Sequence, residues 1–130
     1  MPSDTAEGFA RAFSQAWLMQ DTAGLAALFA QDADFLTLTG QWCEGRAAIE
    51  WVMKAELKGA FARARLVTGR SKLRPLGPEM AIVHQRFVLS GILNADGTDA
   101  GRVATMLIAV LQRGAEGWTA VSGQFAVEGA

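Results

Sequence analysis

Three residues of this chain have the chemistry of an acid–base site: His84, Arg86 and Asp34. His84 is the only histidine, and an ordinary imidazole titrates at about pH 6.5, so it can take a proton from an acidic carbon or from water. An arginine can bind a carboxylate or stabilise an enolate, and a buried aspartate can act as a base. We therefore take His84, Arg86 and Asp34 as candidate catalytic residues, with His84 and Asp34 as a hypothetical dyad.

Each of these side chains also has a structural interpretation. A neutral histidine can hydrogen-bond across a sheet or at a subunit interface, and Asp34 can be a solvated acid beside a turn. Arg86 can pair with Glu79, Glu128 or a partner subunit. The dyad requires His84 and Asp34 on one face of the sheet, within about 6 Å, the span of one bridging water.

His84 and Arg86 stand in the middle of a long apolar segment, residues 80–93 (MAIVHQRFVLSGIL), which predicts a strand. Side chains two apart on a strand share a face, so His84 and Arg86 point the same way, while Gln85 and Phe87 point the other way. Both faces of this strand are otherwise apolar. The alternation therefore leaves open whether His84 and Arg86 face a pocket or a subunit interface.

Several large side chains are candidates for lining a ligand pocket. Aromatic faces and thioethers suit a flat apolar ligand, and a side-chain amide can orient it. The candidate ligand-binding residues are Phe13, Trp17, Trp42, Met106 and Gln124. Phe13 and Trp17 also belong to a stripe at helical spacing, which is equally the pattern of a core.

The pattern of elements is that of an α+β domain. The first half predicts helices over 4–19, over a short segment capped by Asp21, and over 47–58, with strands over 33–39 and 41–43. The second half predicts four strands joined by turns, over 60–73, 80–93, 102–113 and 118–127. Strands this long must twist and bend, so we expect a cone-like, curved sheet, antiparallel or mixed, whose pocket three N-terminal helices close.

Composition limits the function classes. The 130 residues are enough for one domain, 1–130, and a net charge of −1 with scattered basic residues argues against nucleic-acid binding. There is no apolar run of about 18 residues for a membrane span and no basic segment of a secretory signal. One cysteine fits the cytoplasm, and one histidine with one cysteine predicts no metal site. Without a phosphate-binding loop either, we expect no cofactor.

Three segments resemble the SnoaL-like branch of the nuclear transport factor 2-like superfamily. They are FSQAWLMQDTAGLAALFAQDADFLTLTGQWCEGRAAI (13–49), LGPEMAIVH (76–84) and WTAVSGQF (118–125). The resemblance implies a cone-shaped α+β barrel, usually dimeric, with a pocket between the concave sheet and helix one. It implies no single activity. The chain has no tyrosine, which argues against the chemistry of ketosteroid isomerases and scytalone dehydratases in this superfamily.

Two function classes follow. The first is a pocket or assembly domain that binds a small hydrophobic molecule and forms a homodimer through the outer sheet face. The second is a cofactor-free isomerase, cyclase or hydrolase acting on a small apolar carbonyl compound, with His84 as general base. The second class requires His84, Arg86 and Asp34 to converge on one cavity, whereas the first expects them in ion pairs or at an interface.

Overall fold

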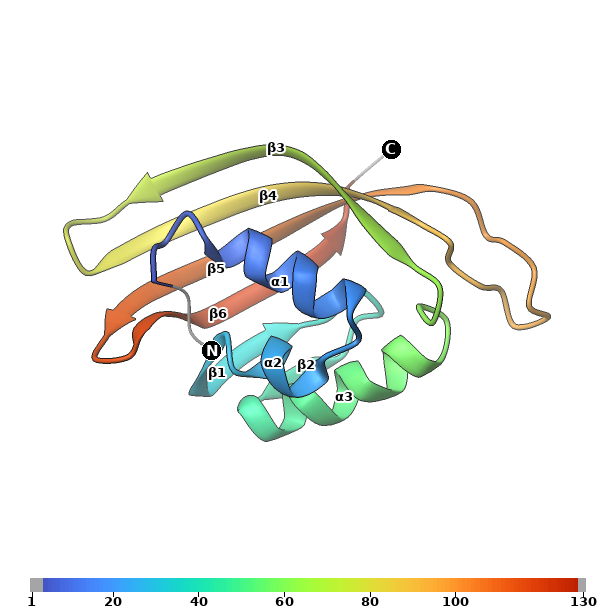
Figure 1. Ribbon diagram of the computed structural model, residues 1–130, viewed down its shortest axis with the longest axis horizontal. Coiled ribbons are helices and arrows are strands. Elements are labelled where there is room, and N and C mark those ends of the chain that lie inside the picture. Colours follow the sequence, from blue (N-terminus) through green and yellow to red (C-terminus); the bar gives the residue numbers. More distant parts are fainter. Residues whose placement is uncertain (1–3, 129–130) are drawn as a thin grey trace.

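A curved sheet with strand order β2-β1-β6-β5-β4-β3 is the frame of the molecule (Figure 1). The computed structural model describes residues 4–128, and within this range the chain forms six strands and three helices. The strands are β1 (Phe29–Leu36), β2 (Trp42–Glu44), β3 (Arg65–Pro75), β4 (Met80–Ser90), β5 (Val103–Gly114) and β6 (Gly117–Val127). The helices are α1 (Phe9–Leu18), α2 (Thr22–Ala26) and α3 (Arg46–Lys58). Within residues 4–128, no helix is long and apolar enough to cross a membrane.

The topology confirms the predicted α+β class. Strands β3 to β6 form an antiparallel meander, and β1 joins the sheet by parallel pairing with β6. The sheet wraps around α1, and all three helices lie on its concave side, which we call the inner face (Figure 1). The outer face is the one turned away from the helices.

Two element boundaries differ from the sequence prediction. Helix α1 begins at Phe9 instead of Asp4, because the chain turns over residues 5–8 and Gly8 takes the N-cap position without a side-chain cap. Strand β3 begins at Arg65 instead of residue 60, because Phe61 and Ala64 are buried in the turns that follow α3. The Asp21 cap is confirmed, with its Oδ1 accepting a hydrogen bond of 2.9 Å from the Gly24 N–H.

A cluster of aromatic rings fills the space between α1 and the inner face. Phe13 is fully buried, and its ring lies 5.8 Å from that of Phe125 and 6.5 Å from that of Phe87. Trp17 is also buried, and its Nε1 donates a hydrogen bond of 3.1 Å to the carbonyl oxygen of Ala64. The position where the resemblance implies a pocket therefore holds close-packed core side chains.

The burial of β4 decides the orientation that alternation leaves open. The odd-numbered residues from Ala81 to Leu89, which include Gln85 and Phe87, are buried on the inner face. The even-numbered residues from Met80 to Ser90 are half-buried on the outer face. His84 and Arg86 therefore lie on the outer face, away from α1.

Candidate functional site

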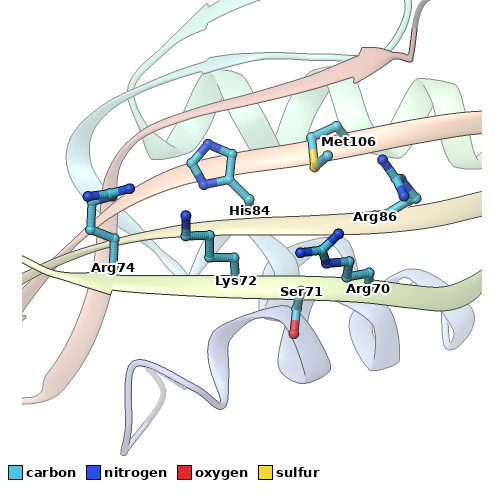
Figure 2. A pocket seen from close by; sticks show the side chains of 7 residues that line it. All are labelled: Arg70, Ser71, Lys72, Arg74, His84, Arg86 and Met106. Carbon is cyan, nitrogen blue, oxygen red and sulfur yellow. The ribbon is translucent and has the colours of Figure 1, made fainter.

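Basic side chains gather on the outer face where β3 and β4 run side by side (Figure 2). They surround a pocket of about 350 Å³, which we call the basic pocket, and its lining residues are Arg70, Ser71, Lys72, Arg74, His84, Arg86 and Met106. The Ser71 side chain points to the opposite side of the sheet from the other six (Figure 2). The pocket combines cations with one apolar wall at Met106, which suits a negatively charged occupant.

A β-bulge in β3 arranges these cations. The register between β3 and β4 shifts between Thr68 and Ser71, so Gly69 and Arg70 together fill the place of one residue. A Cβ on Gly69 would lie 3.1 Å from the Arg86 carbonyl oxygen, which favours glycine at this close approach. The bulge keeps Arg70, Lys72 and Arg74 on one face.

Arg86 is committed to an ion pair within the chain. Its Nε and Nη2 donate to the two carboxylate oxygens of Glu128, at 2.8 and 2.7 Å. This pair raises the pKa of Arg86 above its ordinary value, the hydrogen bond being the larger cause and the charge of Glu128 the smaller. The structural interpretation of Arg86 as a partner of Glu128 is therefore present in the molecule.

His84 lies between Lys72 of β3 and Ile108 of β5 on the outer face. Its Nδ1 is buried and has no hydrogen-bond partner among the described residues. A buried ring nitrogen normally has a partner, so the surroundings of His84 are incomplete in the single chain.

Asp34 lies on the outer face as well, but far from His84. Its Oδ1 accepts a hydrogen bond of 3.1 Å from Trp42 Nε1, and its neighbour in β6 is Ser122. Three strand spacings separate β1 from β4, which is about 14 Å. His84 and Asp34 therefore share a face but form no dyad within one chain.

The five predicted ligand-binding residues do not line one cavity. Phe13 and Trp17 belong to the core under α1. The other three lie on the outer face: Met106 in the basic pocket, Gln124 exposed on β6, and Trp42, 69% exposed, on β2. Helical spacing has the same appearance for a core and for a pocket wall, and here the core takes these rings.

A second hollow opens at the edge of the inner face, where α1 passes β3 and β4. We call it the mouth groove; it has a volume of about 400 Å³ and is lined by Glu7, Ala10, Arg11, Ser14, Gln15, Thr68, Gln85 and Phe87. Gln85 is only 4% exposed, and its Nε2 donates to the carbonyl oxygens of Gly69 and Arg86, at 3.1 and 2.9 Å. The sequence analysis passed over Gln85, although a glutamine with the parity of Phe87 in an apolar strand was the signal for it.

Comparisons with known proteins bear on the fold. No family model matches the chain, and no curated relative matches it. Among solved structures, it is similar to an uncharacterised protein with a cystatin-like fold from Caulobacter vibrioides, with a TM-score of 0.86 at 19% identity over 97% of this chain and 89% of that one.

Two further structures point the same way. An NTF2-like protein with a cystatin-like fold from Novosphingobium aromaticivorans has a TM-score of 0.76 at 18% identity, over 94% of this chain and 79% of that one. A ketosteroid isomerase-like protein from Erwinia carotovora atroseptica has a TM-score of 0.77 at 16% identity, over 95% and 94%. At these identities the likeness concerns the fold, as expected when one fold supports many functions. The chain has the cystatin-like α+β fold of the nuclear transport factor 2-like superfamily, as its sequence motifs predicted.

Proposed function

We propose that this domain binds a small, neutral and largely apolar molecule in the mouth groove. The observation that carries the proposal is the pairing of a buried amide, Gln85, with the ring of Phe87 in the wall of a groove of about 400 Å³. Ligand sites typically combine an apolar wall with a few polar groups that fix orientation. The groove has this composition, with Ala10 and Phe87 beside Ser14 and Thr68.

The hydrogen bonds of Gln85 indicate what the ligand offers. Both N–H bonds of its amide are used on backbone carbonyl groups. Its Oε1 accepts no hydrogen bond from a described residue, and it is not among the fully buried atoms. The Oε1 is therefore available to accept a hydrogen bond from a ligand hydroxyl or N–H group.

The charges of the groove favour a neutral ligand. Glu7 and Arg11 are its ionisable lining residues, and they have opposite signs. A charged ligand would gain no net attraction there, whereas an apolar ring gains contact with Phe87. A neutral phenol or alicyclic alcohol has the required combination.

Binding can be tested by titrating the protein with a panel of neutral phenols and alicyclic alcohols, followed by NMR chemical shifts and thermal shift. We expect saturable binding, and a Kd about tenfold higher for Gln85→Leu, which keeps the bulk and removes the acceptor. Gln124→Leu makes the same change on the outer face and should bind as the wild type does. Ser14→Phe, which fills the groove from α1, should abolish binding even if Gln85→Leu fails to fold. Equal affinity of wild type and Ser14→Phe, or no binding by any compound of the panel, would overturn the proposal.

We also propose that the outer face joins two copies of the chain into a homodimer. Half-buried apolar residues, Leu36, Ile82, Met106, Ile108 and Val110, form the middle of this face. A contiguous apolar patch of this kind is typical of an interaction surface. Sedimentation equilibrium of the wild type should give the dimer mass, and a monomer at concentrations up to about 0.1 mM would contradict the proposal.

The catalytic alternative has less support from the geometry. His84 and Arg86 lie on the outer face, Arg86 is held by Glu128, and Asp34 is on a distant strand. General acid–base catalysis needs its groups within hydrogen-bond reach of one substrate. We therefore take binding, and not His84-dependent catalysis, as the function of the domain.

A further inference from the structure

The outer face carries opposite charges at its two edges. Two rows of directly opposed residues cross all six strands of the described sheet. One row reads Trp42, Leu36, Gln124, Ile108, His84 and Lys72, and the next reads Glu44, Asp34, Ser122, Val110, Ile82 and Arg74. The β1–β2 edge thus presents two exposed carboxylates, the middle is apolar, and the β3 edge presents exposed cations.

We propose that two copies pair outer face to outer face about a two-fold axis parallel to the strands, so that the acidic edge of each copy covers the basic edge of the other. The proposal rests on the homodimer proposed above and specifies its arrangement. Asp34 and Glu44 of one copy would then face Lys72 and Arg74 of the second copy, and the symmetry repeats this contact at the other side.

The geometry follows from symmetry. A two-fold axis that brings two outer faces together must lie in the plane between them. If the axis is parallel to the strands, the strand order of the second copy is reversed while each row keeps its level. With the axis between β5 and β6, β2 of one copy lies over β3 of the other, and β1 lies over β4. Glu44 then meets Arg74 of the second copy, and Trp42 meets Lys72, a contact of a cation with an indole face.

The other orientation is electrostatically unfavourable. With the axis perpendicular to the strands, β3 would lie over β3, and Arg70, Lys72 and Arg74 would face their own copies. The carboxylates of Asp34 and Glu44 would likewise face each other. Like charges placed opposite one another suppress an interface, whereas complementary patches favour it.

The second copy also accounts for the basic pocket. The only ion pair between described residues, Arg86 with Glu128, leaves the other pocket cations without a carboxylate of their own chain. The whole face is about 24 Å wide and about 36 Å along its longest strands, on the order of 800 Å², which is what one partner contributes to a standard interface. We therefore assign the acidic edge of a second copy as the occupant of the basic pocket.

Charge reversal tests the arrangement. Lys72→Glu with Arg74→Glu makes both edges acidic, and Asp34→Lys with Glu44→Lys makes both basic. We expect each variant to dimerise at least about tenfold more weakly than the wild type at low salt. All four substitutions in one chain should restore the wild-type Kd, and mixing the two reversed chains should give a heterodimer. The matched control is Arg11→Glu with Lys54→Glu, the same charge change on two exposed helix positions, which should dimerise like the wild type.

The outcomes separate the two proposals. A wild type that is monomeric overturns the homodimer itself. A dimeric wild type whose Kd is the same in both reversed variants keeps the homodimer but overturns this arrangement, because perpendicular pairing replaces like-charge contacts with like-charge contacts. Inorganic phosphate that binds the basic pocket of the dimer without weakening dimerisation would also overturn it, since the pocket would then be free. Thermal unfolding of each variant shows that its chain is folded.

Discussion

Arg86 on β4 and Glu128 just after β6 are joined by two hydrogen bonds of 2.8 and 2.7 Å, across the intervening strand β5. The pair connects the outer face to the end of the described chain and neutralises the one arginine that the sequence offers as a stabiliser of negative charge. Because both side chains are partly exposed, at 42% and 32%, solvent screens the attraction between them.

The first prediction concerns this pair. Glu128→Gln should lower the urea midpoint only slightly, and the effect should fade as salt concentration rises, because a screened pair adds little stability. Arg86→Gln should have an equal effect, and the double variant should cost no more than either single one. A large loss of stability that salt does not reduce would show that the pair is effectively buried.

The second prediction concerns the aromatic core. Phe13→Ala should lower the free energy of unfolding by about 3–5 kcal/mol, because it removes a fully buried ring and leaves a cavity. Trp51→Ala is the control: its side chain is 77% exposed on α3, and its loss should change stability by no more than about 0.5 kcal/mol. Urea unfolding followed by far-UV circular dichroism measures both. Equal effects would mean that Phe13 is not part of a packed core.

The third prediction concerns a glycine that holds the end of β4 against the turn before β3. Gly91 has a φ of +78°, and a Cβ there would collide with the carbonyl oxygen of Arg63. Gly97 has a similar φ of +85°, but open space around it. Gly91→Ala should therefore cost clearly more than the roughly 1–2 kcal/mol expected for Gly97→Ala from backbone strain. Thermal unfolding compares the two variants, and similar losses would contradict the close approach.

The fourth prediction concerns Cys43. Burial, and to a smaller extent the charge of Glu56, raises the pKa of this thiol. The folded state then favours the protonated thiol, so the stability linked to it is fully present below the ordinary thiol pKa of about 8.5 and is lost as pH rises toward the raised value. The urea midpoint should fall more steeply above this pH in the wild type than in Cys43→Ser. Parallel pH profiles would show that Cys43 titrates equally in both states.

The amino-acid pattern was sufficient for the architecture, because each element carries its own local signal. Asp21 caps a short helix, turn residues separate long apolar segments, and the spacing of Phe9, Phe13 and Trp17 places one face of α1 against the sheet. The start of α1 was harder to predict. Asp4 and Glu7 have the pattern of a capping box, but the chain turns again before Phe9, and only packing decides such a boundary.

The functional residues divide differently between sequence and structure. Alternation along β4 determined that His84 and Arg86 share one face and that Gln85 and Phe87 share the other. Only the tertiary structure decided which face is which, because both are apolar enough to be a core. Packing of Phe87 against Phe13 of α1 turns Gln85 toward the mouth groove and leaves His84 outside, and the order of strands then separates His84 from Asp34.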